Sequence, residues 1–396
     1  MAGAGMNCST GFDGVRLLAG VEIPYRRHGQ TSTSDLLAQA FQAAIARAGL
    51  RADEVDGLGV ASFTHGPDRA IDLAWKLSLQ PRWIMDDSNG GTSGLNVLMH
   101  AARAIQCGDA SAIVVVAGDH FEAQDFQRLV EHYNLTTRNY LRPLGAGSPN
   151  SLFAMLTSRH MEASGLRRED YGTLAVTQRG WAGQNPLAVY REPLSLEDYL
   201  AAPMVSDPLC RFDCVPVVDG ANAIVLVRSD HPCVDKSASS TPVRMLAMAA
   251  RHNIDHQEGG GLRTGLADVA GSLWNAVGMG PQDMDVVSIY DDYPVMVLVQ
   301  LADLGFFAPG DAQRFVHEQI ATRKLALNTS GGQLSAGQAG AACSLHGLVE
   351  AMIHLQGQAG ERQVEHARHA LVTGYGMVEY RYGMCSTALI LQGDGQ

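Results

Sequence analysis

The chain contains two copies of one arrangement: a helix, a short acidic turn and a buried strand. The first copy covers residues 35–62, where the helix continues into AGLRADEVDGLGVAS. The second covers residues 265–290, where the helix continues into VGMGPQDMDVVSIY. Gly49 matches Gly278 at an offset of 229 residues (278 − 49), and Asp56 matches Asp285 at the same offset. Strands that alternate with helices predict an α/β sheet, and the repeat predicts two such halves.

A second repeated unit is an apolar helix that ends at glycine and precedes a strand. Residues 86–109 read DDSNGGTSGLNVLMHAARAIQCGD, and residues 340–357 read GAACSLHGLVEAMIHLQG. Matching Gly108 to Gly357 gives an offset of 249, which predicts an insertion within 305–325 of the second half. A helix that is apolar on nearly all sides is buried. We therefore expect both helices near a pseudo-twofold axis, with their N-termini pointing into one cleft.

The segment between the halves breaks this pattern. Residues 120–205 are richer in Arg, Asn, Pro and Tyr, and we interpret them as an inserted lid. The strand GANAIVLVRSD then closes the first half. The predicted organisation is an N-terminal half of residues 1–119 and 206–235, a lid of residues 120–205, and a C-terminal half of residues 236–396.

Composition excludes several classes of function. The chain has 396 residues, is 46% hydrophobic and carries a formal net charge of −12, which argues against nucleic acid as a partner. It contains no apolar run long enough to span a membrane and no signal-peptide pattern, so we expect a cytoplasmic protein. Seven cysteines are interpreted as reduced thiols. Cys210 and Cys214 have no second Cys or His pair nearby, so we predict no metal site.

Five ordered motifs give the chain a family resemblance. The segments are NGGTSGL followed by IQCGDASAIVVVAGD, then DCVPVVDGANAIVLV, SIYDDYPVMVLVQLADLGFF, NTSGGQLSAGQAGAACSLHGLVEA and TGYGM. In this order they resemble the nucleophile loop, the end of the first half, the oxyanion-hole stretch, the histidine loop and the C-terminal glycine loop of the thiolase superfamily. The resemblance is to the sterol-carrier-protein type of thiolase and its relatives, and it covers nearly the whole chain.

The resemblance implies a duplicated five-layer αβαβα thiolase fold and a homodimer. It implies a coenzyme A thioester as substrate, with no bound cofactor. Many proteins of this branch work with a small partner that has a zinc ribbon and an OB-fold, and the resemblance implies such a partner here. Four residues of the predicted lid are expected to shape the site of the acyl group: Phe126, Tyr133, Leu141 and Phe153.

The resemblance does not carry over the thiolase mechanism. The position of the nucleophilic cysteine matches Gly91, and the position of the activating histidine matches Gln338. The second Cys or His of the last glycine loop is missing from VTGYGM. Thr92, Ser93 and Cys343 are alternative nucleophiles, but an unactivated hydroxyl is a poor nucleophile.

Without a nucleophile, the cleft retains groups for acid–base chemistry. Helix N-termini and glycine turns supply N–H donors for an enolate oxygen. YDDY, with Tyr290 at its start, is similar to the YDxF-like pattern of steroid side-chain aldolases, which use tyrosines in a retro-aldol cleavage. Those aldolases carry a further tyrosine where this chain has Gln338, so a single tyrosine, or help from His346 or Tyr375, would be required.

We predict two sets of site residues. The catalytic candidates are Tyr290, Gln338, His346 and Tyr375, and the oxyanion and pocket candidates are Gly91, Thr92, Ser93, His120, Asp291, Ser330 and Gly376. Asp291 and Asp292 are adjacent, so in an extended segment they point to opposite faces and at most one can assist Tyr290.

Three functions remain open at this level. The leading hypothesis is a C–C lyase that cleaves or forms a bond in a CoA thioester without an acyl-cysteine, with retro-aldol cleavage of a β-hydroxyacyl-CoA as its concrete form. The second is an acyltransferase with an unusual nucleophile. The third is a non-catalytic subunit that binds acyl-CoA or scaffolds a thiolase-like complex.

Overall fold

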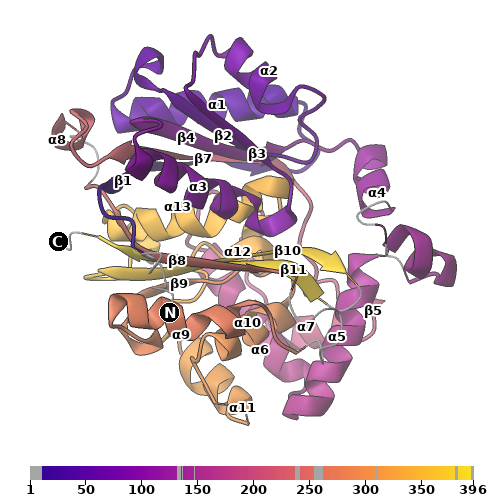
Figure 1. Cartoon of the computed structure of the whole chain (residues 1–396). Coiled ribbons are helices and arrows are strands. Elements are labelled where there is room, and N and C mark those ends of the chain that lie inside the picture. Colours follow the sequence, from indigo (N-terminus) through magenta and orange to yellow (C-terminus); the bar gives the residue numbers. More distant parts are fainter. Residues whose placement is uncertain are drawn as a thin grey trace, which may run out of the picture.

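The computed structural model describes residues 11–131, 135, 137–146, 148–236, 241–253, 262–308, 310–379 and 382–393. Two β-sheets alternate with three layers of helices, so that helices cover both outer faces and also fill the space between the sheets (Figure 1). The predicted five-layer αβαβα arrangement is confirmed. Among the described helices, none combines the length and the apolar character needed to cross a membrane.

The first sheet has the strand order β1-β7-β4-β2-β3. Its strands are β1 (Val15–Arg26), β7 (Asp219–Arg228), β4 (Ala112–Asp119), β2 (Gly57–Ala61) and β3 (Trp83–Asp87). β2 is parallel to β3 and β4, whereas β7 is antiparallel to β4 and β1. Every residue of β4 is buried because this β-branched strand is covered by helices on both faces.

The second sheet repeats this plan. Its order is β8-β11-β10-β9, made by Arg244–His252, Tyr382–Gln392, His369–Glu379 and Val286–Ser288. β9 is parallel to β10, and β11 is antiparallel to both β10 and β8. Four strands of the first sheet therefore have counterparts in the same order and relative direction, which confirms the predicted duplication. β3 is the further edge strand of the first sheet.

The middle layer contains the two apolar helices singled out in the sequence. They are α3 (Ser93–Cys107) and α13 (Cys343–Leu355), which contact each other between the sheets (Figure 1). Leu95 and Leu98 of α3 share one buried core with Leu345 and Leu348 of α13. α3 ends at Gly108, whose φ of 82° is the left-handed conformation that glycine adopts most easily.

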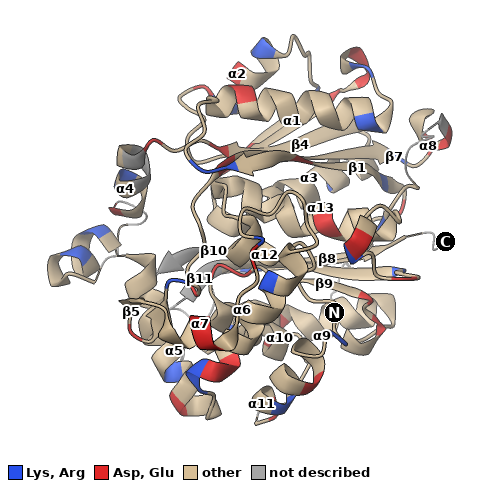
Figure 2. Ribbon diagram, turned by 180° about the vertical axis from the view of Figure 1, so that it is seen from behind, with Lys and Arg blue, Asp and Glu red and all other residues tan. Residues whose placement is uncertain are grey.

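The outer layers hold the helices of the first repeated unit. α1 (Thr33–Ala48) and α2 (Arg69–Lys76) cover the first sheet, and α9 (Leu266–Val277) and α10 (Pro294–Asp303) cover the second. Charged residues lie mostly on these outer helices and on loops, and few lie along the sheets (Figure 2). Shorter helices complete the chain: α8 (Cys233–Lys236), α11 (Ala312–Phe315) and α12 (Gly332–Ala336). α11 lies within the predicted insertion of residues 305–325.

The segment that breaks the repeat is largely helical. It contains α4 (Ala123–Glu131), α5 (Pro149–Ser164), α6 (Arg168–Ala182), α7 (Leu196–Ala201) and the first strand of the small hairpin of β5 (Met204–Ser206) and β6 (Leu209–Cys210). α5 and α6 pack against α10, whereas α4 projects to the side of the molecule (Figure 1). Much of the predicted lid is therefore packed beside the second half, and the domain boundaries stay a prediction.

Candidate active site

A cavity lies where the turn before α3 meets the loops that follow the strands of the second sheet. Its walls come from that turn, the loop after β9, the loop between α12 and α13, and β10, with α4 and α5 at one side. Five predicted site residues line it: Gly91, Tyr290, Gln338, Tyr375 and Gly376. Further lining residues are Phe63, Gly90, Phe121, Leu129, Val130, Pro149, Phe153, Val215, Val217, Asp292, Tyr293 and Gly340.

Tyr290 is held at the cavity by its backbone. It lies two residues beyond the end of β9 and is buried. Its N–H donates to Oγ1 of Thr373 at 2.9 Å, and its carbonyl accepts from Nε2 of Gln300 at 2.8 Å. Oγ1 of Thr373 in turn donates to Oε1 of Gln300 at 2.7 Å. This closed set of hydrogen bonds fixes the direction from which the phenol ring enters the cavity.

The ring of Tyr290 occupies the space that a side chain at position 91 would fill. A Cβ atom on Gly91 would overlap Cζ and Cε2 of Tyr290 and the carbonyl oxygen of Tyr375. Gly376 is equally constrained, because a Cβ there would lie 2.6 Å from the amide nitrogen of Gly91. Glycine at 91 is thus a packing requirement of the tyrosine, and the phenol stands where the resemblance would place a nucleophile.

The side-chain amide of Gln338 lies beside the phenol of Tyr290. The backbone of Gln338 is fixed between two residues, since its N–H donates to the carbonyl of Pro216 at 2.9 Å and its carbonyl accepts from the N–H of Val218 at 3.0 Å. Its Nε2 lies 3.4 Å from Oη of Tyr290 and 3.2 Å from Oε1 of Gln333. An amide donates hydrogen bonds but does not take up protons near neutral pH. Gln338 therefore contributes polarity and orientation to the site.

Aromatic rings form one wall of the cavity. Tyr375 lies in β10, with its ring centroid 6.4 Å from that of Tyr290 and 6.4 Å from that of Phe153. Phe153 stacks on Tyr293 at 4.1 Å, and the hydroxyl of Tyr293 donates to Oδ1 of Asn150 at 2.6 Å. Phe153 of α5 lines the cavity, and its predicted role in shaping the site of the acyl group stays a prediction. Leu141 is buried outside the lining, the side chain of Phe126 is not described, and Tyr133 lies outside the described residues.

The two adjacent aspartates face different surroundings. Asp291 points away from the cavity, where its Oδ1 accepts from the N–H of Gln333 at 2.8 Å and its Oδ2 accepts from Nε2 of Gln178 at 2.7 Å. Burial raises the pKa of Asp291 to about 7. Asp292 lines the cavity instead. The prediction of Asp291 as a pocket residue is corrected, because its carboxyl group is used to hold α12 and α6.

Comparisons with known proteins agree with this geometry. Residues 247–392 match the family described as thiolase C-terminal domain-like. The chain is 28% identical, over 88% of its length and 93% of the relative, to the 17-hydroxy-3-oxo-4-pregnene-20-carboxyl-CoA lyase of Mycobacterium tuberculosis. It is also 28% identical to the steroid side-chain-cleaving aldolase of Thermomonospora curvata, over 81% and 86% of the two chains.

Solved structures extend the likeness to the whole fold. The Ltp2-ChsH2(DUF35) aldolase matches with a TM-score of 0.81 and 25% identity, over 96% of this chain and 98% of that one. The chain has the thiolase fold. This fold is also shared by the monomeric SCP2-thiolase-like protein type 1 of Mycobacterium smegmatis, with a TM-score of 0.72 at 15% identity over 96% and 77% of the two chains.

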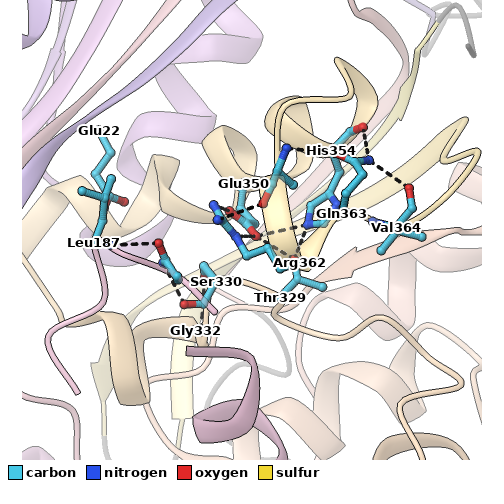
Figure 3. A network of polar contacts seen from close by, with 12 residues as sticks. Glu22, Leu187, Thr329, Ser330, Gly332, Glu350, His354, Arg362, Gln363 and Val364 are labelled. Carbon is cyan, nitrogen blue, oxygen red and sulfur yellow. Dashed lines mark hydrogen bonds and ion pairs between the residues drawn. The ribbon is translucent and has the colours of Figure 1, made fainter. Parts of the chain in front are cut away.

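In this chain of thiolase fold, His346 lies behind the cavity. Its Nδ1 is 2.8 Å from Oε2 of Glu22, and its Nε2 is 2.8 Å from Oγ of Ser330. Burial alone would lower the pKa of His346, but the Glu22 carboxylate raises it above its ordinary value. Ser330 also accepts from the N–H of Gly332 at 3.1 Å (Figure 3). The structure therefore places both predicted residues in a buried supporting network, outside the cavity lining.

The three alternative nucleophiles of a thiolase-type acyl transfer are also withdrawn from the cavity. Thr92 is fully buried, and its Oγ1 donates to the carbonyl of Asn89 at 3.2 Å. Ser93 is fully buried, and no described residue hydrogen-bonds its Oγ. Burial raises the pKa of the Cys343 thiol well above its ordinary value, which disfavours the thiolate. The predicted pocket positions of Thr92 and Ser93 are thus corrected, because both side chains turn into the core.

His120 lies at the carboxyl end of β4, the central strand of the first sheet, and outside the cavity lining. It follows β4 directly, and its Nδ1 is 3.2 Å from Oδ2 of Asp219 while its Nε2 is 3.4 Å from Oε1 of Glu122. The next residue, Phe121, lines the cavity instead. The predicted pocket position of His120 is corrected by one residue, because Asp219 draws the imidazole away from the cavity.

Sequence reasoning missed several lining residues. Phe63, Phe121, Val215 and Val217 are apolar residues from three separate loops, and nothing in their local pattern separates them from core residues. Asp292 could have been found, since it belongs to the YDDY motif and was recognised as the alternative to Asp291. Only the packing of the loop after β9 decides which carboxyl group faces the cavity.

Proposed function

We propose that this enzyme of thiolase fold cleaves a carbon–carbon bond in a β-hydroxyacyl-CoA by a retro-aldol reaction. The observation that carries the proposal is the replacement of a nucleophile's side chain at position 91 by the phenol of Tyr290. The lyase and the aldolase to which the chain is 28% identical carry that type of chemistry in their names. A steroid or another bulky acyl group attached to CoA is the substrate class that these relatives favour.

The reaction requires no covalent intermediate with the protein. A base removes the proton of the β-hydroxyl group, a carbonyl forms at that carbon, and the bond to the α-carbon breaks. Its electrons pass into the thioester as an enolate, which then takes a proton at the α-carbon. The hydroxyl of Tyr290, the amide of Gln338 and the N–H groups of the glycine turns are donors for the oxygen atoms that become charged.

The alternative of acyl transfer lacks a group in position. Thr92, Ser93 and Cys343 are buried away from the lining, and a thiol with a raised pKa is a weak nucleophile at neutral pH. A purely scaffolding subunit would have no use for a cavity lined by a phenol, a carboxyl group and an amide. The polar lining therefore favours the lyase over both alternatives.

The proposal also includes the oligomeric state, the partner protein and the compartment. We expect a homodimer, because the edge strand β3 carries the exposed side chain of Ile84 and the side chain of Trp75 in α2 is 81% exposed. We also expect a small partner with a zinc ribbon and an OB-fold, because the similar aldolase structure is named together with a DUF35 component. CoA enters as part of the substrate, and the cytoplasm is the proposed compartment.

Tyr290→Phe tests the proposal, because it removes one oxygen atom and little volume. With β-hydroxyacyl-CoA substrates, including a 17-hydroxysteroid thioester, we expect kcat for cleavage to fall about 10²- to 10⁴-fold. CoA affinity and the midpoint of unfolding should change little. Mass spectrometry of the two products and calorimetry with CoA provide the measurements.

The matched control is Tyr171→Phe, which removes a buried hydroxyl that lies 2.7 Å from Nδ1 of His160, outside the cavity lining. This variant should cleave at the parent rate. If Tyr290→Phe cleaves within a few-fold of the parent, Tyr290 is structural and the proposal loses its main residue. A stable acyl adduct in the intact mass of the parent would favour acyl transfer instead.

A further inference from the structure

The cavity needs a group that accepts a proton near neutral pH, and most of its polar residues do not supply one. Tyrosine has an ordinary pKa near 10, so the phenol of Tyr290 is a better donor than acceptor. The amide of Gln338 does not titrate. The hydroxyl of Tyr293 already donates to Asn150, and His346 lies outside the lining. Asp292 is the one carboxyl group among the lining residues that the structure describes.

One of the two carboxyl oxygens of Asp292 is buried without a hydrogen-bond partner among the described residues. Asp292 is 7% exposed, and the oxygen to which no described residue donates is its Oδ1. Two other aspartates, the buried Asp291 and the partly buried Asp303, provide a comparison. Asp291 accepts from Gln178 and Gln333, and Asp303 accepts from the N–H and Oγ1 of Thr264. An unpartnered buried oxygen destabilises the fold, so its presence beside Tyr290 indicates a group kept for a ligand.

We propose that Asp292 is the general base of the site and carries the substrate's proton from the β-hydroxyl oxygen to the α-carbon. This inference rests on the proposed retro-aldol reaction. The Asp292 carboxylate accepts the hydroxyl proton while the carbon–carbon bond breaks and its electron pair enters the enolate. The carboxylic acid then returns that proton to the α-carbon, which yields the ketone or aldehyde and the shortened acyl-CoA. Asp292 ends as the carboxylate, so the cycle balances without another reactant.

The surroundings of Asp292 suit this task. Burial and the neighbouring Asp291 raise the pKa of Asp292 well above its ordinary value, while the backbone amides of Tyr293 and Asp292 itself oppose that rise. The other titratable groups lining the cavity are tyrosines 290, 293 and 375. A carboxylate with a raised pKa is a stronger base than an ordinary aspartate. Tyr290 then keeps its proton and donates a hydrogen bond to a developing oxyanion.

Asp292→Asn tests the inference with two measurements on the intact enzyme. Asparagine has nearly the same volume and removes a buried charge, so folding should persist. The first measurement is kcat for cleavage of a β-hydroxyacyl-CoA, which we expect to fall at least about 100-fold. The second is exchange of the α-protons of propionyl-CoA with D₂O, which uses the same base without any carbon–carbon chemistry. We expect exchange by the variant to fall by a similar factor.

The matched control is Asp303→Asn at the far end of α10. Burial raises the pKa of Asp303 to about 7, yet it lies outside the cavity lining. This variant should retain parent rates in both measurements.

The outcomes separate the two proposals. If the parent cleaves and Asp292→Asn cleaves within a few-fold of it, the role of Asp292 is refuted and the retro-aldol function stands. If the parent exchanges α-protons through Asp292 but cleaves no β-hydroxyacyl-CoA, the cleavage function is refuted while Asp292 remains a carbon-acid base. If the parent neither cleaves nor exchanges, both proposals are refuted.

Discussion

The two central helices start in the same way but use their N-termini differently. A 3-10 turn of residues 90–92 precedes α3, and a 3-10 turn of residues 340–342 precedes α13. The two helix N-termini are in contact, because the N–H of Gly94 in α3 donates to Oγ of Ser344 in α13 at 2.8 Å. The duplication therefore supplies two helix N-termini at one place, each with N–H donors and the positive end of a helix dipole.

At the N-terminus of α13, a carboxylate of the protein itself accepts a hydrogen bond from a free N–H group. Oδ2 of Asp119, at the end of β4, accepts from the N–H of Ala341 at 2.7 Å, and its Oδ1 accepts from the N–H of Thr64 at 2.8 Å. Both turns reach the cavity, the one before α3 with Gly90 and Gly91 and the one before α13 with Gly340. A carboxylate thus occupies the anion site of one half, and we propose that the other half leaves its donors to a substrate oxygen.

The largest expected effect on stability comes from the buried Glu350, in the middle of α13. Glu350 of α13 is buried, where its oxygens accept from Nε and Nη2 of Arg362 at 2.8 and 2.9 Å and contact Thr329 (Figure 3). When the helices are aligned at their first residues, Ser93 and Cys343, the counterpart of Glu350 in α3 is the exposed His100. Removing one partner of a buried ion pair leaves the other uncompensated. Glu350→Gln should therefore lower the free energy of unfolding at pH 7 by about 3–5 kcal/mol in urea titrations.

The same variant has a defined pH dependence. Burial alone would raise the pKa of Glu350, but the hydrogen bonds from His354 and Arg362 hold it well below its ordinary value. The stabilisation is thus present above the unfolded pKa of about 4.3 and is lost as the pH falls toward the lower folded pKa. The difference between parent and variant should shrink below about pH 4. A His100→Gln control should change stability by less than about 0.5 kcal/mol. Equal stabilities of parent and Glu350→Gln at pH 7 would contradict this account.

The second effect concerns the turns themselves. Gly91→Ala forces a methyl group into the ring of Tyr290, whereas the matching position of the other turn already holds the buried Ala341. We expect a loss of about 1–3 kcal/mol in the free energy of unfolding. In a Tyr290→Ala background the same methyl group should cost much less, and a double-mutant cycle measures the difference. Additive effects would mean that the ring does not set the size of residue 91.

The smallest effect concerns the contact between the two N-termini. Ser344→Ala removes the acceptor for the N–H of Gly94 and the donor to the carbonyl of Ala341. We expect a loss of about 1 kcal/mol in stability, with cleavage changed only a few-fold. A fall in kcat comparable to that of Tyr290→Phe would show that this contact belongs to the reacting site, and the two helices would then differ less than the structure suggests.

The fold was predictable because its signals are local and occur twice. The helix that ends at Gly108 and the buried strand that follows it are readable from a dozen residues, and the second copy confirms the pattern. The position of Tyr290 also followed, because a β-branched strand directly precedes it. Gly91 and Gln338 were placed by motif order rather than by physical reasoning.

The remaining site residues depend on long-range packing. β9 ends at Ser288, so strand alternation does not extend to the two aspartates, and contacts from α6 and α12 decide which of them turns away. His346 follows Cys343 by one helical turn on a helix buried on nearly every side, so its sequence offers no preferred face. Its partner Glu22 is 324 residues away in the chain.

The mutual exclusion of a side chain at 91 and the ring at 290 has an evolutionary consequence. No single substitution can convert this site into one with a cysteine nucleophile, because Gly91→Cys would place its Cβ inside the phenol of Tyr290. A lineage that exchanged one chemistry for the other had to pass through an intermediate with glycine at the first position and a small residue at the second. Such an intermediate would have neither catalyst, so it must have persisted for another reason, such as binding a thioester without reacting.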